Sequence, residues 1–260
     1  MKMVKRNSRR KETPKPHTSA WMAFEQNLGS ISHMLALSNR EAVRLKRQAV
    51  RMTGLFTPTP DLTAALTRKK LLRSLKRFLK TVSTGFERFQ TISLWQIVML
   101  VTCVEAYLQD VLAAAAAVDP QLMDNSEQHA TYPDVIDATS LDALAAVMRT
   151  RWARNWLNPG GPTRWIGQLT KMGVSGYPSN LGPRLELFWG IRHLAVHSAG
   201  VATPDFVKRH PLVVKAVGDR VKVNAKYFKT FHEAVLEFLT PTEEYFLQRY
   251  PALKIASPAS

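Results

Sequence analysis

The chain has a single cysteine, Cys103, in 260 residues. One cysteine cannot form an internal disulfide, which argues against a disulfide-stapled secreted domain and for a reducing compartment, here expected to be the cytoplasm. The basic N-terminus is not followed by the apolar stretch of a secretory signal. Acidic residues are also scarce, because 20 Asp and Glu stand against 36 Lys and Arg, a formal net charge of +16. Such an excess indicates a polyanionic partner, RNA, DNA or an anionic membrane, and says nothing about the fold.

Motifs for cofactor and metal binding are absent as well. The sequence contains no Gly-rich phosphate-binding loop of the Walker or dinucleotide type, no CxxC and no HExxH. His193 and His197 are spaced for two ligands on one helix face, but no third ligand is near them in sequence. We therefore expect no metal and no cofactor. Cys103 lies in an apolar stretch and is expected to pack there rather than to act as a nucleophile.

The most hydrophobic stretch covers residues 92–118. Gln96, Glu105, Gln109 and Asp110 interrupt it, and a membrane-spanning helix rarely carries such residues near its middle. The stretch is therefore expected to be a buried helix of a globular protein.

Helical periodicity dominates the chain and predicts an all-α fold. Helices are expected over 19–52, 67–82, 92–118, 141–157, 163–172, 184–199 and 224–250. One short β-hairpin is expected at 212–223, where two β-branched runs flank Gly218 and Asp219. The expected organisation is a basic disordered arm over 1–18, a helical extension over 19–84, a helical domain over 85–250 and a tail over 251–260.

Two stretches combine many bases with apolar or aromatic side chains. In 67–82 the apolar residues recur at helical spacing and the remaining face is basic, with no acid. Such a helix can follow an RNA backbone or lie on a membrane, and an ordinary solvated helix face is an equal alternative. In 149–165 arginines alternate with tryptophans, and we expect core tryptophans with arginines that face solvent or RNA. The predicted RNA-binding residues are Lys69, Lys70, Arg73, Lys76, Arg77, Arg151 and Arg154.

The stretch "RHLAVHSAG" (192–200) ends the expected helix 184–199, with Gly200 as its stop. Apolar residues surround much of this helix, so it is expected to be substantially buried. A buried Arg192 needs an anionic partner, because unpaired burial of a charge is costly. Glu105 in the expected buried helix 92–118 has the reciprocal need. We therefore expect an Arg192–Glu105 pair.

Arginine and histidine together supply the groups for RNA cleavage without a metal. Histidine moves protons near neutral pH, and the arginine fork matches a charged phosphate. The nucleophile is the 2′-OH of the substrate itself, so the products would carry a 2′,3′-cyclic phosphate. The simpler alternative is that His197 only stabilises the helix C-terminus, where a cation suits the helix dipole.

The stretch "FWGIRHLAVHSAG" resembles the signature of the HEPN superfamily, the all-α domain of many ribonucleases. That signature is Arg, a polar residue, three further residues and His, which Arg192, His193 and His197 match. "LVTCVEAYLQDVL" (100–112) resembles the earlier helix of these proteins, with Glu105 as its acidic residue. The resemblance is to the RiboL-PSP-HEPN-like prokaryotic branch and covers about residues 85–250.

The resemblance implies a homodimer in which Arg and His of both chains meet in one composite cleft. Such a cleft would resolve a geometric difficulty, because residues five apart lie about 140° around an ideal helix. His197 would then transfer the proton, Arg192 stabilise the phosphate, His193 orient or assist, and Glu105 position Arg192. Many such domains are toxins or phage-defence effectors, which implies an antitoxin or a larger defence complex as a further partner.

Two alternatives to an endoribonuclease stay open. Some HEPN proteins lack catalysis, so the first is a non-catalytic RNA-binding or assembly module on the same fold. The second is a membrane-surface protein anchored by the helix 67–82. This is the least favoured of the three functions, so a membrane is not an expected partner.

Overall fold

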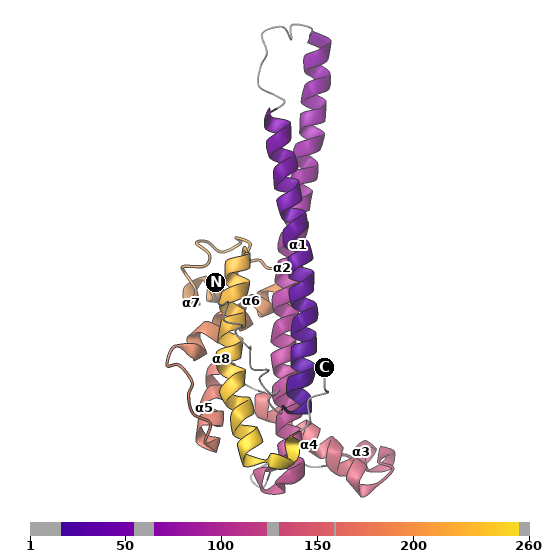
Figure 1. The fold of residues 1–260 in the computed structure, drawn as a ribbon, viewed down its shortest axis with the longest axis vertical. Helices are drawn as coiled ribbons and strands as arrows, with labels where there is room; N and C mark the ends of the chain where they lie inside the picture. The colour runs from indigo at the N-terminus through magenta and orange to yellow at the C-terminus, as the bar shows by residue number, and fades with distance from the viewer. Residues whose placement is uncertain (1–16, 55–64, 124–129, 159, 255–260) are drawn as a thin grey trace, which may run out of the picture.

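The computed structural model describes residues 17–54, 65–123, 130–158 and 160–254, and the side chains of 65–89, of much of 35–54 and of Ala225 lie outside that description. Residues 1–16 of the arm expected over 1–18, and most of the tail expected over 251–260, fall outside it. The end of the arm was wrongly predicted as disordered, because Thr18 is buried and hydrogen-bonded to Glu243. The described residues confirm the all-α fold (Figure 1). The helices are α1 Ser19–Gly54, α2 Ala65–Val118, α3 Tyr132–Asp137, α4 Leu141–Leu157, α5 Pro162–Met172, α6 Leu181–His197, α7 Pro204–Arg209 and α8 Ala225–Arg249, with 3-10 turns at Pro120–Met123 and Pro251–Leu253.

Helix α2 is one continuous helix of 54 residues, where the sequence predicted separate helices over 67–82 and 92–118. The segment contains no proline, and its one glycine, Gly85, costs only about 1 kcal/mol relative to alanine in a helix interior. The expected boundary between 84 and 85 thus falls inside a helix. α1 runs antiparallel along α2, and the pair extends well beyond the other helices as a long hairpin (Figure 1).

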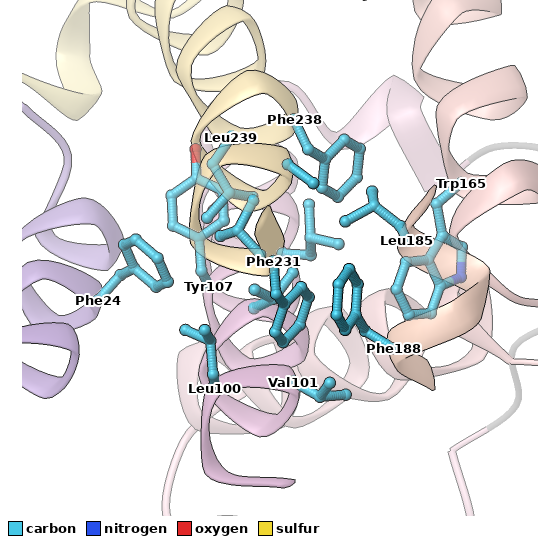
Figure 2. Close-up of a cluster of buried hydrophobic side chains, with 14 of the residues drawn as sticks. Phe24, Leu100, Val101, Tyr107, Trp165, Leu185, Phe188, Phe231, Phe238 and Leu239 are labelled. Atoms are coloured by element: carbon cyan, nitrogen blue, oxygen red, sulfur yellow. The ribbon is translucent and has the colours of Figure 1, made fainter. Parts of the chain in front are cut away.

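The start of α1 belongs to the core rather than to a separate extension. Trp21, Phe24 and Ile31 are buried. Figure 2 shows Phe24 of α1 beside Tyr107 of α2, in the cluster that α6 and α8 complete. The first turns of the expected 19–84 extension therefore pack with the domain that follows.

The C-terminal half of α2, Gln90–Val118, which is the lower half in Figure 1, is the centre of the core. The segment Gln90–Val118 is long and apolar enough to cross a membrane by length and composition alone, and 44% of its most apolar window is buried against the other helices. The helix expected to be buried thus keeps one exposed face, with Ile92, Trp95 and Met99 on it. α1, α4, α6 and α8 all contact α2. Across α2 from α1, Phe188 of α6 stacks on Phe231 of α8 with ring centroids 4.2 Å apart (Figure 2).

The β-hairpin expected at 212–223 is not formed, and the described residues contain no strand. The turn itself lies where expected, because Gly218 has a φ of +90° and the Asp219 carboxylate accepts a hydrogen bond from the Ala216 backbone N–H. The chain after the turn pairs with the residues that follow α6 instead of with 212–217. Val201 and Arg220 form an isolated antiparallel bridge, and Val221 N–H donates to the Gly200 carbonyl oxygen.

A buried carboxylate ties the start of α1 to α2 and α8. Glu243 of α8 is only 3% exposed. It accepts hydrogen bonds from the Thr18 N–H at 2.6 Å, the Thr18 hydroxyl at 3.0 Å and the Tyr107 hydroxyl at 2.9 Å. Burial, with the Glu243 carboxylate beside it, raises the pKa of Tyr107 well above its usual value, so the phenol stays a donor. Three donors compensate the cost of burying this charge.

We predict that Tyr107→Phe lowers the free energy of unfolding by about 1–2 kcal/mol, because Glu243 loses one donor while it stays buried. Chemical denaturation followed by circular dichroism measures the change. The control is Tyr132→Phe, which removes the hydroxyl of a tyrosine that is 78% exposed and should leave stability unchanged. Equal stability of Tyr107→Phe and wild type would contradict the role given to this network.

Candidate active site

Helix α6 packs antiparallel against the lower half of α2. Trp189, near the middle of α6, contacts Glu105 of α2, and the end of α6 lies beside Leu94. The approach at that end is close, because a Cβ on Gly200 would lie 2.7 Å from the Leu94 Cδ1 atom. Ala199 and Gly200 both have positive φ, +49° and +79°, so the backbone turns away immediately after His197. α6 ends two residues earlier than expected, with Ser198 as its C-cap, so Ala199 rather than Gly200 is the first left-handed residue after the helix. Gly200 follows it and allows the close contact with α2.

The structure brings Arg192 and Glu105 together, as the sequence predicted. The Arg192 Nη2 atom lies 3.7 Å from Glu105 Oε2, an ion-pair distance longer than a direct hydrogen bond. The other oxygen, Oε1, accepts a hydrogen bond from the Trp189 indole N–H at 3.0 Å. Trp189 and Arg192 lie three residues apart in α6, so one carboxylate holds two neighbouring side chains.

Arg192 keeps donors that the protein does not use. Its side chain is 34% exposed, and its Nε atom is buried without a hydrogen-bond partner among the described residues. A guanidinium has five N–H donors in a planar fork. Glu105 lies at one edge of that fork and the Nε atom is closed off from solvent, so the exposed Nη donors are the ones that suit an anionic oxygen such as that of a phosphate.

The two histidines lie on the solvent side of the same helix. His193 and His197 are both exposed, and their ring centroids are 4.5 Å apart with the planes tilted by 46°. His197 is the last residue of α6. Within the part of the chain that the structure describes, no group of three or more His, Cys, Asp or Glu side chains could hold a metal ion. α6 thus carries two exposed imidazoles and a guanidinium held by Glu105.

Exposed apolar side chains lie on both helices of this pair. Ile92 and Met99, which are 44% and 43% exposed, share one face of α2, and Val196 of α6, between the two histidines, is 45% exposed. We call Ile92, Met99 and Val196 the apolar strip, because exposed apolar side chains of this kind suit contact with another protein.

The predicted RNA-binding residues fall into two groups. Lys69, Lys70, Arg73, Lys76 and Arg77 are on the helical backbone of α2, and their side chains lie outside the described residues. Arg151 donates to Asp134 at 2.6 Å, and this contact holds the pKa of Asp134 well below its usual range. Arg151 thus forms a salt bridge with Asp134 of α3, which partly neutralises its charge. Arg154 is exposed.

The residues expected in the core are mostly there. Trp152 and Trp165 are buried, and the Trp165 indole N–H donates to the Leu157 carbonyl oxygen at 2.8 Å. Cys103 is half-buried, and burial raises the pKa of its thiol, which disfavours a reactive thiolate.

Sequence reasoning missed Trp189 and Trp95. Trp189 looks like one more apolar residue of a buried helix, and only its three-residue spacing from Arg192 could have indicated a shared partner. Trp95 falls in the most apolar stretch of the chain, yet its side chain is 53% exposed.

Comparison of the chain with models of protein families, with curated proteins and with solved structures finds no match.

We predict that Glu105→Gln lowers the free energy of unfolding by about 1 kcal/mol, because the change removes the charge that Arg192 faces. If the chain cleaves RNA, as the sequence predicts, the cleavage rate should fall as well, because Arg192 loses its orienting partner. Thermal melts and cleavage rates are the two measurements.

The matched control is Glu237→Gln, which removes the partner of Arg184 at the other end of α6, where the Nη1 to Oε2 distance is 2.5 Å. It should cost similar stability and leave cleavage unchanged. An unchanged melting temperature together with unchanged cleavage in Glu105→Gln would count against the positioning role.

Proposed function

We propose that this protein is a metal-independent endoribonuclease of the HEPN type. The observation that carries the proposal is the held guanidinium: Glu105 orients Arg192 at 3.7 Å, and exposed His193 and His197 follow on the same helix. An ion pair with only a structural role would not require two exposed histidines on the same helix. A histidine that only stabilises the helix C-terminus would not require an arginine held by a carboxylate.

The chemistry uses these groups in a balanced sequence. The His197 imidazole takes the proton from a ribose 2′-OH, and the 2′ oxygen attacks the adjacent phosphorus. Arg192 donates to the oxygens of the phosphorane, on which negative charge develops. The bond from phosphorus to the 5′ oxygen then breaks, and a protonated imidazole returns a proton to that oxygen. The products are a 2′,3′-cyclic phosphate and a 5′-OH, and His193 orients or assists the proton transfer.

The active form in this proposal is a homodimer. Arg192 and His197 lie about 140° apart around α6, so one chain alone presents them in different directions. A second copy packed on the strip of Ile92, Met99 and Val196 would bring the Arg192 of one chain toward the His197 of the other. Two-fold symmetry makes such a contact self-complementary.

The remaining expectations follow the same proposal. The net charge of +16 supplies attraction for RNA. Toxin or phage-defence activity in the cytoplasm, with an antitoxin or a larger defence complex as restraint, is the setting that we propose. The alternative function is a non-catalytic RNA-binding or assembly module on the same fold, which would keep the affinity and lack the cleavage.

The test uses wild type, Arg192→Ala and His197→Ala with end-labelled RNA in excess EDTA. We expect wild type to cleave and to leave cyclic phosphate ends, and each variant to lose at least about 100-fold in rate, since each lacks a group that acts in the transition state. His232→Ala, which removes a half-buried histidine of α8, is the control and should keep the rate.

Mapping the product ends gives the second readout. Cyclic phosphate ends exclude a contaminating nuclease that leaves 5′-phosphates. Equal inactivity of all three proteins with RNA binding retained would overturn the enzyme proposal in favour of the binding module.

A further inference from the structure

A cavity of about 430 Å³ opens between α2, the end of α6 and the chain segment 220–222. Its volume lies within the range of small-molecule sites. Leu94 and Trp95 line it from α2, Ala195 from α6, and Arg220 and Lys222 from the segment after the Gly218 turn.

The lining combines an aromatic and apolar surface with two cations. Trp95 offers an indole that is about half exposed, and Leu94 and Ala195 add apolar surface. Arg220 and Lys222 supply positive charge, and no acidic residue is among the described residues that line the cavity. A flat aromatic group joined to an anion fits this combination, and a nucleotide is such a molecule.

Backbone contacts fix the two cations at the cavity. The bridge between Val201 and Arg220 joins the segment to the end of α6. Val223 N–H donates to the Gln90 Oε1 atom at 3.1 Å, which joins the same segment to α2. This contact also orients the Gln90 carboxamide at the wall, with its amino group left to donate to a base.

The cavity lies one helical turn from the candidate active site. Ala195 and Arg192 are three residues apart in α6, about 4.5 Å along the helix axis, so they share one side of it. Ile92, Met99 and Val196 do not line the cavity. Trp95 lies between Ile92 and Met99 at helical spacing on α2, so its exposed indole borders both the apolar strip and the cavity.

We propose that this cavity binds one nucleotide of the RNA substrate, next to the phosphodiester that Arg192 contacts, with its base on Trp95 and its phosphate at Arg220 and Lys222. The inference rests on the proposed ribonuclease function, which it extends by a subsite that selects the cleavage position. Base stacking on tryptophan supplies affinity, and Gln90 supplies a hydrogen bond that differs between bases.

The test measures binding of a fluorescein-labelled 2′-O-methyl RNA hexamer, which has no free 2′-OH and cannot be cleaved by this chemistry. Fluorescence anisotropy gives Kd for the full chain. We expect Trp95→Leu to weaken binding about tenfold through lost stacking. Ala195→Met should weaken it as well, because the longer side chain fills the cavity without a change of charge.

The double variant Arg220→Gln/Lys222→Gln should weaken binding and reduce the slope of log Kd against log salt by about 1–2, since up to two phosphate contacts are lost. Its matched control is Lys171→Gln/Arg249→Gln. That pair also removes one lysine and one arginine. Lys171 lies in α5 and Arg249 is the last residue of α8, at the end of α8 away from the cavity, where Tyr245 contacts Met172. Tyr132→Leu is the control for Trp95→Leu, because it also removes one exposed aromatic side chain.

The outcomes separate this proposal from the ribonuclease proposal. Weak binding by the cavity variants, with both controls like wild type, supports the subsite even if wild type fails to cleave ordinary RNA. Wild-type affinity in Trp95→Leu and in the charge pair overturns the subsite even if wild type cleaves. Failure of the wild-type chain to bind the hexamer also overturns it. Melting curves of each variant show that the fold is kept.

Discussion

The packing of α6 against the lower half of α2 is the contact on which the rest of the structure depends. It brings Glu105 to Arg192 and Trp189, and it lets Gly200 approach Leu94 where α6 ends. A half-buried guanidinium is tolerated there because a carboxylate lies beside it, and removal of either partner would leave a charge poorly compensated. The same contact orients the outer side of α6, so the two histidines face solvent and Arg192 is left partly exposed beside its carboxylate. Local stability and the proposed chemistry therefore rest on one pair of helices.

In the proposed ribonuclease, the surfaces around this pair of helices have separate roles. The guanidinium and the imidazoles would supply charge stabilisation and proton transfer, the strip around Val196 would contact a second copy, and the cavity at Trp95 would hold a neighbouring nucleotide. The segment 220–222 contributes to the last of these only because it pairs with the end of α6. Its two cations thus reach the active-site end of the helix from far along the chain.

The sequence predicted local features well and non-local ones less well. Helix α4 lies where its periodicity placed it, and the need of a buried arginine for a carboxylate was enough to predict the Arg192–Glu105 pair. The hairpin prediction was wrong, since a turn at Gly218 says nothing about which segment the returning chain will meet, and Gly200–Ala202 compete successfully. α2 proved continuous because neither Gly85 nor any proline stops it. Glu243 and Trp95 act through partners more than 80 residues away in the chain, which spacing alone could not indicate.

The most direct test of the central claim mixes two inactive proteins, Arg192→Ala and His197→Ala, under conditions that allow their subunits to exchange. A composite cleft takes its arginine from one chain and its histidine from the other, so each mixed dimer contains one intact set. The mixture should regain up to about a quarter of wild-type cleavage, because half of the dimers are mixed and each keeps one of the two Arg–His pairs of the cleft. A mixture that stays inactive although mixed dimers are recovered by two affinity tags would contradict the account.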